Sequence, residues 1–353
     1  MIAFFPTYAR RLPGEKRWRA TVAGMVSRPL PPQSRRRSLA IGILRRLLEL
    51  DESQLQSEVF QRRVNAFLFR RVAGERVRIM LGGRLIDVGS SDRVGHFQHV
   101  IDLEETDVDA LAQPADAFVP AAACRWLPYQ SATAADDRGI GNQLLSHAPA
   151  AGGIQLIDEA GLSVISDIDD TVKVTNVENR RELLANTLLR EFYAVQGMPE
   201  IYRGWQESGT AFHYVSASPW QLASCLEGFL RSSGLPGGSM HLKIFRLKDS
   251  TPLGRLSSRK RSKRRLIEQI ITDFPRRKFL LVGDSGERDP EVYAAVARRY
   301  PGKVAAVAIR QLEGKLPRVK VRARLDRLAK RLPAGTMHIF SAAEDLAACL
   351  PGG

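Results

Sequence analysis

The sequence of 353 residues lacks the features that mark secreted and membrane-spanning proteins. Its three cysteines, Cys124, Cys225 and Cys349, are isolated and widely spaced, so they support neither a disulfide framework nor a cysteine-based zinc site. No window approaches the roughly 18 consecutive apolar residues of a transmembrane helix. The apolar run at the start is far too short for the hydrophobic region of a signal peptide. We therefore expect a cytoplasmic protein without a transmembrane segment.

Acidic residues are too few to balance the basic ones. The chain has 53 Lys and Arg against 38 Asp and Glu, which gives a formal net charge of +15. Such an excess favours an anionic partner: a nucleic acid, an acidic membrane surface or a phosphorylated substrate. The sequence has no recognised nucleic-acid module and no basic stretch interleaved with stacking aromatic residues, so nucleic acid is the least favoured of the three. Peripheral association with an anionic membrane remains open.

The length and the hydrophobic content of 44% predict two domains. In residues 1–127 we expect a small β-rich α+β domain with a helical insertion after its first strand. The two inserted helices carry apolar stripes, with Ile43, Leu44, Leu47 and Leu48 in the first helix, and we interpret these stripes as core. The expected elements are a strand at 18–26, helices at 39–50 and 54–71, and a β-meander at 77–81, 85–88 and 97–103.

Residues 128–153 are rich in Ala, Ser, Gly and Asp without a periodic pattern and are interpreted as a linker. In residues 154–353 apolar strands alternate with helices, which predicts an α/β domain with a doubly wound parallel sheet. The expected strands are 162–165, 210–215, 241–247, 279–282, 303–309 and 336–340. The helices are expected at 177–192, 218–230 and 290–299 and in a segment that contains Ile267 and Ile270, while 315–331 is a basic stretch.

The most informative stretch is Leu162–Thr171, where a short apolar run ends at three carboxylates, Asp167, Asp169 and Asp170. Open α/β sheets place their sites at the carboxyl ends of strands. Because side chains alternate along an extended segment, Asp167 and Asp169 can point the same way. Two like charges so close imply a bound cation or one protonated carboxyl. A hard divalent ion such as Mg²⁺ fits oxygen ligands better than zinc does.

Two other interpretations of these acids are a solvated turn and a calcium-binding loop. Aspartate favours turns, so the first would be preferred if the segment stood alone. The second is supported by Glu178 at the twelfth position from Asp167. However, such a loop needs a glycine at its sixth position, where this chain has Val172, and a helix before it rather than a strand. The calcium loop is therefore excluded.

Two further strand ends carry polar side chains of the same kind. Ser216 follows one predicted strand, and Asp284 with Asp289 follows another. The basic run 255–265 can add a lysine. Acids for attack, proton transfer and metal binding, together with a hydroxyl and an ammonium group, are the parts of a phosphoryl-transfer site.

At this point the sequence resembles the haloacid-dehalogenase-like phosphatases. Asp-Ile-Asp-Asp-Thr at 167–171 is similar to their first motif, Ser216 to the second, a lysine to the third, and Gly283-Asp284 with Asp289 to the fourth. Within that superfamily, the residues of these motifs resemble those of the actin-patch-associated phosphatidate phosphatase group. The resemblance covers roughly 160–310, and it implies a Rossmann-like fold for the catalytic domain.

The resemblance also implies roles for the motif residues. Asp167 is expected to be the nucleophile and Asp169 the general acid and base, while Ser216 binds a phosphoryl oxygen. Asp284 is expected to complete a magnesium site with Asp167 and the backbone carbonyl of Asp169. Thr171 and Asp170 are interpreted as local structure.

The third-motif lysine and the last acid leave alternatives open. Lys263 is the preferred lysine because it lies eleven residues before Phe274-Pro275, the spacing that the resemblance implies, and Lys260 is the alternative. Asp289 can belong to the metal site, or it can cap the next helix because Pro290 follows it. Ser218 is interpreted as the cap of the helix that follows Ser216.

By the same resemblance we expect a magnesium-dependent, phosphatidate phosphatase-like enzyme that forms an aspartyl-phosphate, with an anionic phospholipid at a membrane surface as its partner. The alternative keeps the chemistry and changes the substrate to a nucleic-acid end, a phosphoprotein or a small soluble phosphomonoester. A third possible function is that of a binding protein with an inactive site. The presence of both Asp167 and Asp169 argues against it.

Overall fold

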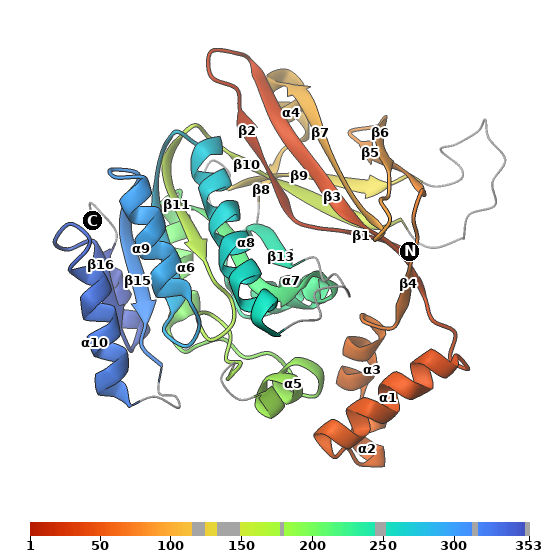
Figure 1. The fold of residues 1–353 in the computed structure, drawn as a ribbon. Coiled ribbons are helices and arrows are strands. Elements are labelled where there is room, and N and C mark those ends of the chain that lie inside the picture. The colour runs from red at the N-terminus through yellow and green to blue at the C-terminus, as the bar shows by residue number, and fades with distance from the viewer. Residues whose placement is uncertain (115–123, 133–148, 177–179, 244–251, 313–316, 350–353) are drawn as a thin grey trace. The chain divides into compact units, whose positions relative to one another are not determined.

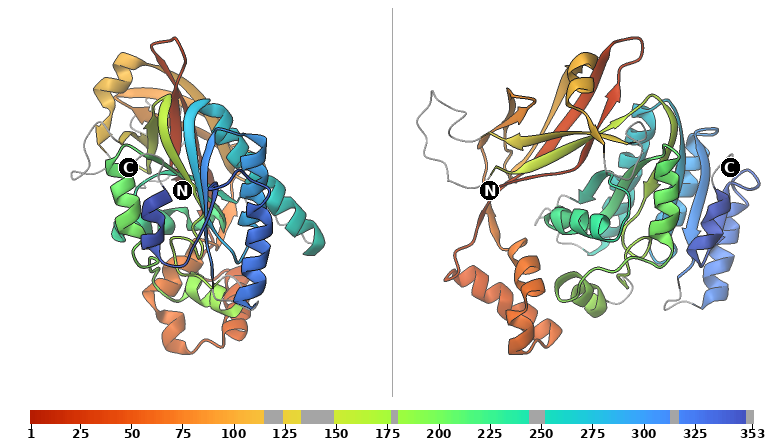
Figure 2. Two further views of the ribbon diagram at one scale, coloured as in Figure 1. Left: turned by 90° about the vertical axis from the view of Figure 1, so that its left-hand side faces the viewer. Right: turned by 180° about the vertical axis from the view of Figure 1, so that it is seen from behind.

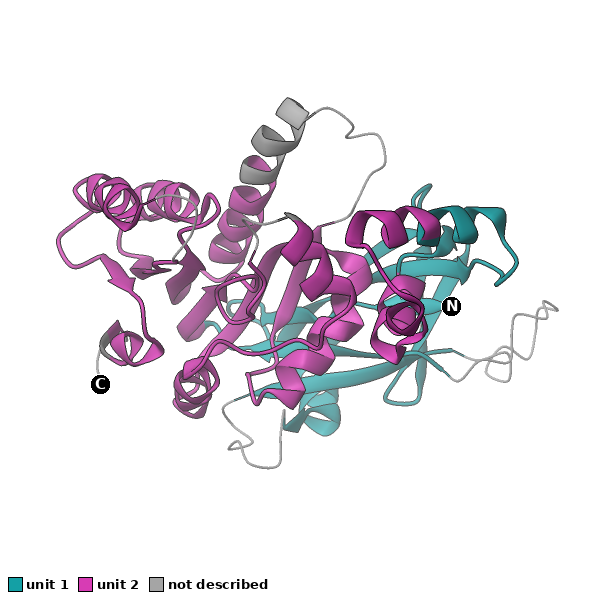
Figure 3. Cartoon of the chain, turned by 90° about the horizontal axis from the view of Figure 1, so that it is seen from below, with its two compact units in different colours: residues 1–41, 67–159 teal, residues 42–66, 160–353 magenta. Residues whose placement is uncertain are grey.

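The chain forms two compact units in a computed structural model (Figure 3). The first consists of 1–41 and 67–159, and the second of 42–66 and 160–353. The structure describes residues 1–114, 124–132, 149–176, 180–243, 252–312 and 317–349, and of residues 180, 252–260 and 348 it describes the backbone alone.

The first unit is built on a ten-stranded, mostly antiparallel sheet of order β1-β3-β2-β10-β9-β5-β6. β4 and β7 pair with β3, and β8 pairs with β9 (Figure 1). The strands are β1 Ile2–Phe4, β2 Thr7–Arg11, β3 Arg17–Pro29, β4 Phe69–Arg71, β5 Arg76–Leu81, β6 Arg84–Ser90, β7 His96–Glu104, β8 Gln113–Pro114, β9 Arg125–Ser131 and β10 Ala151–Ile157. The helix α4 Glu105–Leu111 follows β7. Strands therefore dominate this unit, with a core that includes Trp18, Val22, Ile79, Leu127 and Ile154.

The predicted β-meander is only partly correct. β5 and β6 form the expected antiparallel hairpin around Gly82 and Gly83, whose φ values of 55° and 79° suit a tight turn. β7, however, pairs along nearly its whole length with β3, which precedes the helices in sequence, rather than with β6. Pairing with β3 buries the alternate residues Phe97, Ile101 and Leu103 in the core of the sheet.

The helical insertion consists of α1 Arg35–Leu48, α2 Glu52–Gln56 and α3 Glu58–Asn65. The single helix predicted at 54–71 is wrong, because Ser57 ends α2 and its hydroxyl caps α3. The prediction that the apolar stripe of the first helix is core holds for Leu48 alone. Leu44 is half-buried, while Ile43 and Leu47 are each 56% exposed.

The unit boundaries differ from the predicted domains 1–127 and 154–353. Residues 128–131 of the expected linker belong to β9 and 151–153 to β10, while 133–148 lie outside the described residues. Backbone pairing between β9 and β10 closes this part of the sheet, so the first unit continues to residue 159. Residues 42–66 group with the second unit because α3 packs against α5, Arg180–Leu188.

The second unit contains a six-stranded parallel sheet of order β13-β12-β11-β14-β15-β16. The mixed α/β architecture with a parallel sheet is confirmed. Continuous apolar runs such as Phe279–Val282 form its central strands, as expected for strands buried on both faces. The strands are β11 Ala160–Ser166, β12 Ala211–Pro219, β13 Ser239–Lys243, β14 Arg276–Asp284, β15 Val304–Arg310 and β16 Met337–Phe340.

Helices cover both faces of this sheet. Figures 1 and 2 show α8 Pro252–Asp273, α9 Asp289–Arg299 and α10 Arg318–Ala329 on one face, and α6 Met198–Glu207 and α7 Ala223–Ser232 on the other. The helix α6 and the helical form of the basic stretch 315–331 were not expected from the sequence. Two short 3₁₀ helices, η1 Trp220–Leu222 and η2 Ala343–Cys349, complete the unit.

The order of the strands reverses at the centre of the sheet. After β11 the chain adds β12 and β13 on one side and then returns to add β14, β15 and β16 on the other. Sites in open α/β sheets lie outside the carboxyl ends of the strands at such a switch point. The loops after β11 and β14 therefore mark where a site is expected.

The side chain of Arg277 joins the amino-terminal ends of β11 and β14, away from the expected site. It is 3% exposed and donates to Ser163 Oγ at 2.9 Å and to the carbonyl oxygens of Ala160 and Leu162.

We expect Arg277→Met to lower the free energy of unfolding by about 3 kcal/mol, because buried polar groups lose their donor. Urea denaturation measures this. Arg276→Met is the matched control on an exposed neighbour and should change stability by less than about 0.5 kcal/mol. Equal losses in both variants would contradict the assigned role of Arg277.

Candidate active site

The loop after β11 is a tight turn that holds Asp167 and Asp170 in position. The backbone N–H of Asp167 donates to the carbonyl oxygen of Val282 in β14 at 2.9 Å. Asp170 has a φ of 56°, and its carboxylate accepts the backbone N–H groups of Thr175 at 2.7 Å and Asn176 at 2.8 Å. Aspartate tolerates this left-handed conformation because its side chain can bond the nearby backbone. Asp170 is thus a structural residue, as expected.

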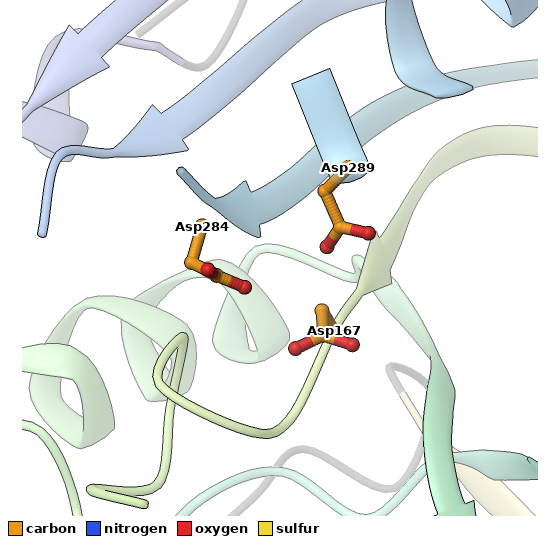
Figure 4. A group of neighbouring side chains, drawn as sticks. All are labelled: Asp167, Asp284 and Asp289. Atoms are coloured by element: carbon orange, nitrogen blue, oxygen red, sulfur yellow. The ribbon is translucent and has the colours of Figure 1, made fainter. Parts of the chain in front are cut away.

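Three acids meet at the carboxyl ends of β11 and β14. Asp167, Asp284 and Asp289 are each at most 3% exposed, and one carboxylate oxygen of each lies within 4.8 Å of the others. Figure 4 shows the three side chains converging from β11, β14 and the start of α9. A Cβ on Gly283 would lie 2.5 Å from Asp289 Oδ2, so glycine is required for this close approach.

Lys263 of α8 provides the positive charge of this cluster. Its Nζ lies 2.7 Å from Asp167 Oδ1 and 2.6 Å from Asp289 Oδ1. Burial opposes the charge of Lys263, but Asp167 and Asp289 outweigh it and hold the pKa of the ammonium well above its usual value. Lys263 is thus a lysine that the structure brings to the acids, and the side chain of the alternative, Lys260, lies outside the described residues.

One ammonium does not balance three carboxylates. Burial, with the neighbouring acids, raises the pKa of Asp167 and of Asp284 well above the usual value, although Lys263 acts in the opposite direction on both. Among the described residues, Asp284 Oδ2 and Asp289 Oδ2 are buried without a hydrogen-bond donor. Buried acceptors without a donor and uncompensated negative charge fit a hard divalent cation.

Asp169 lies outside the three-acid cluster, in a pocket of donors. Its Oδ1 accepts from Lys173 Nζ at 2.8 Å and Thr175 Oγ1 at 3.0 Å. Its Oδ2 accepts from Ser216 Oγ at 3.1 Å and Ser218 Oγ at 2.6 Å. Burial disfavours the charged form of Asp169, but Lys173 and the hydroxyl donors outweigh it, and the pKa of this carboxyl is lowered. The two acids of the first motif therefore lie in opposite electrostatic environments.

A second buried lysine, Lys173, holds Asp169 among its donors. The side chain of Lys173 is 2% exposed, and its Nζ lies 4.5 Å from the ring centroid of Phe192. The guanidinium of Arg63 in α3 lies 3.4 Å from the same centroid and donates to the carbonyl oxygen of Thr187 at 3.0 Å. Cations over an aromatic face are attracted by its quadrupole. The inserted helix α3 thus contacts the segment that packs on Lys173.

The structure divides the predicted site residues into two groups. Asp167, Lys263, Asp284 and Asp289 form the cluster, whereas Asp169 and Ser216 form the adjacent pocket. Of the two roles left open for Asp289, the helix cap is wrong, because Arg288 holds the cap position and the Asp289 carboxylate binds Lys263.

The sequence interpretation missed three donors to Asp169. Ser218 was expected only as a helix cap, but it lies in β12, which continues to Pro219, and helix α7 begins later, at Ala223. Its spacing of two from Ser216 was the available signal, because alternate residues of a strand face the same way. Lys173 and Thr175 carried no comparable signal, since the turn that brings them back to Asp169 is irregular.

A family model for the catalytic domain of phosphatidate phosphatase APP1 matches residues 162–311. This segment is similar to the APP1-type catalytic domain. The match includes both acids of the first motif, Ser216, Lys263 and the acids after β14, and it confirms the resemblance to the actin-patch-associated phosphatidate phosphatase group. The APP1-type domain therefore contains the whole cluster and the whole pocket of Asp169.

Two curated relatives match the same part of the chain. Phosphatidate phosphatase APP1 of Saccharomyces cerevisiae is 34% identical over 154 residues, which cover 42% of this chain and 26% of the relative. An uncharacterized protein of Schizosaccharomyces pombe is 33% identical over 163 residues, with 45% and 26% covered. The aligned part thus spans about a quarter of the length of each relative.

Among solved structures, one described by the words "The active site of a carbohydrate esterase displays divergent catalytic and non-catalytic binding functions" matches 94% of this chain and 96% of its own. The sequence identity is 9% and the TM-score 0.24. At this score no shared fold follows.

The ion pair between Lys173 and Asp169 gives a test of the pocket that needs no activity. We expect Lys173→Met to lower the free energy of unfolding by about 3 to 5 kcal/mol, because it leaves a buried carboxylate without its cation. The double variant Lys173→Met/Asp169→Asn should recover part of this loss, since the uncompensated charge is also removed. A double-mutant cycle in urea measures the coupling. Additive losses would show that the two side chains act independently.

Proposed function

We propose that this chain is a magnesium-dependent phosphatase of phosphatidate-like lipids that works through an aspartyl-phosphate on Asp167. One observation carries the proposal: Asp167 lies buried at the end of a central strand, paired with Lys263 and clustered with Asp284 and Asp289. A haloacid-dehalogenase-like fold is part of the proposal. The strand order, with the candidate nucleophile following β11 at the switch point, supports it.

The described residues fit Mg²⁺. Asp167 and Asp284 would hold the ion together with the backbone carbonyl of Asp169, and Asp289 would lie beside them. The two buried carboxylate oxygens without donors, on Asp284 and Asp289, support this assignment. The bound ion would neutralise negative charge on the transferring phosphoryl group and on the Asp167 carboxylate.

In the first step a carboxylate oxygen of Asp167 attacks phosphorus, and the bond from phosphorus to the lipid oxygen breaks. Lys263 stabilises the negative charge on the transferring group. Asp169 gives a proton to the leaving oxygen. The donors around Asp169 favour its ionised form. The negative charge of a bound phosphate would raise the pKa of Asp169, because like charges disfavour ionisation. Asp169 can therefore take up a proton from solvent water, which it then transfers to the leaving oxygen.

In the second step Asp169, now a carboxylate, accepts a proton from water, and the water oxygen attacks phosphorus. The bond from phosphorus to Asp167 breaks, which releases inorganic phosphate and restores both acids. The donors Lys173, Thr175 and Ser218 hold the base in position. Ser216 would donate to a phosphoryl oxygen when substrate is present.

The substrate class rests on the APP1-type match and on the charge of the chain. The yeast relative is named phosphatidate phosphatase, and the net charge of +15 suits an anionic lipid surface. No helix in the described part of the chain is both long and apolar enough to cross a membrane. We propose a cytoplasmic enzyme that works peripherally on an anionic membrane, a proposal that the APP1-type match and the positive charge of the chain support.

A phosphate-release screen tests the proposal. The substrates are phosphatidate, lysophosphatidate, sugar phosphates, a phosphopeptide and a 5′-phosphorylated oligonucleotide, each with and without Mg²⁺. We expect release from the lipids, loss of release with a chelator, and better recovery with Mg²⁺ than with Ca²⁺. Release from another class alone would overturn the lipid assignment, and release that survives the chelator would overturn the metal requirement.

We expect Asp167→Asn to abolish phosphate release, because an amide cannot attack phosphorus as a carboxylate does. The fold should persist, since the substitution keeps the shape of the side chain and removes one of several buried negative charges. Release is measured on phosphatidate, and thermal unfolding serves as the control for folding. Activity near that of the unaltered protein would end the assignment of Asp167 as nucleophile.

For Asp169→Asn we expect turnover to fall about 100- to 10,000-fold, because both proton transfers lose their group. A second readout separates this role from that of Asp167: ³²P-labelled phosphate should accumulate covalently on the Asp169→Asn variant and not on Asp167→Asn. Acid-stable labelling after a short incubation detects it. A much smaller loss of turnover without labelling would remove Asp169 from the mechanism.

A further inference from the structure

Helix α1 exposes large apolar side chains on its outer side. Leu39 is 67% exposed, and Ile43 and Leu47 are 56% exposed. Because they are four residues apart, the three side chains lie along one stripe of the helix, which we call the α1 stripe. The helix is already held by its other side, where Leu48 is buried and Leu44 half-buried. The α1 stripe is therefore not needed to pack the helix.

The charges of α1 are of a single sign. Residues 35–48 contain five arginines and no acid. At about 100° per residue, Arg35, Arg36 and Arg46 lie beside or within the α1 stripe, and all three are exposed. An outward helix face normally carries polar side chains of both signs. This one combines an apolar stripe with arginines alone.

We infer that the α1 stripe is a docking surface for an anionic lipid membrane, on which the helix lies in the plane of the interface. This inference rests on the proposed lipid substrate. Helices that bind in this way present Leu and Phe to the acyl boundary and Lys or Arg to the headgroups. With 14 residues, α1 is too short to span a bilayer, so it lies on the surface.

The composition of the face disfavours the other occupants. A nucleic-acid backbone would bind the arginines, but it offers nothing to Leu39, Ile43 and Leu47. A second copy of the chain in a two-fold contact would place rows of arginine against each other without an acid in either helix. An anionic membrane satisfies both the apolar stripe and the positive charge.

The test measures binding of the full chain to vesicles of phosphatidylcholine with and without phosphatidylserine. Phosphatidylserine is not a phosphomonoester, so binding is separated from turnover. We expect Leu39→Ala/Ile43→Ala/Leu47→Ala to weaken partitioning into the anionic vesicles at least about tenfold, because the buried apolar area is lost. The matched control is Leu85→Ala/Val100→Ala, which truncates side chains that are 43% and 50% exposed on strands. It should bind like the unaltered chain.

Two further variants guard against an effect of misfolding. Ile43→Trp should bind anionic vesicles more tightly than the unaltered chain, a gain that misfolding does not produce. Arg35→Gln/Arg36→Gln/Arg46→Gln should weaken binding at low salt, and added salt should reduce the difference. Thermal unfolding of each variant checks that its fold is retained.

Three results would overturn the inference. The first is unchanged vesicle binding by the triple alanine variant. The second is self-association of the unaltered chain that this variant abolishes. The third is loss of oligonucleotide binding in the arginine variant while vesicle binding persists. Release of phosphate from a short-chain, water-soluble phosphatidate separates this inference from the proposed function. If the unaltered chain releases phosphate but the triple alanine variant still binds vesicles, the docking surface alone is overturned. If that variant loses vesicle binding but the unaltered chain releases no phosphate, the proposed function alone is overturned.

Discussion

The ammonium of Lys263, shared by Asp167 and Asp289, is the interaction on which the geometry of the site depends. Three buried carboxylates within 4.8 Å of one another would repel strongly without a cation between them. A single lysine reduces that repulsion but leaves negative charge and two carboxylate oxygens without donors. Further positive charge would therefore stabilise the site, and this supports the proposed magnesium ion at the carboxyl ends of β11 and β14.

The same electrostatic logic separates the two acids of the first motif. Asp167 lies among acids, and burial raises its pKa, whereas Asp169 lies among donors, and its pKa is lowered. Pairs of acids whose surroundings shift their pKa values apart are typical of sites in which one acid attacks and the other moves protons. Lys173 helps to lower the pKa of Asp169, whereas burial and the neighbouring acids raise that of Asp167 although Lys263 opposes them. Both lysines come from outside the strand that carries the acids.

The helical insertion contributes in two ways. Through Arg63 in α3 it contacts Phe192, on which Lys173 also packs, so the insertion is joined to the segment that supports the pocket of Asp169. Through α1 it exposes an apolar stripe among arginines, which we infer to be a docking surface for an anionic membrane. The apolar stripes of the helical insertion predict ordinary core. In the structure the insertion instead combines a contact with Phe192 and an exposed apolar stripe.

The sequence by itself determined the parallel α/β architecture of the second unit and the identity of the acids, because apolar runs that end in aspartate are local patterns and parallel strands bring their carboxyl ends to one edge. It also indicated Lys263, through its spacing from Phe274. Only the tertiary structure decided that β7 pairs with β3, that Asp289 binds Lys263 rather than capping α9, and that Ser218 and Lys173 serve Asp169. It likewise decided that Ile43 and Leu47 face outward while Leu48 packs inward. Periodicity shows which residues share a face of a helix or strand, but what that face meets depends on segments distant in sequence, whose positions no local pattern contains.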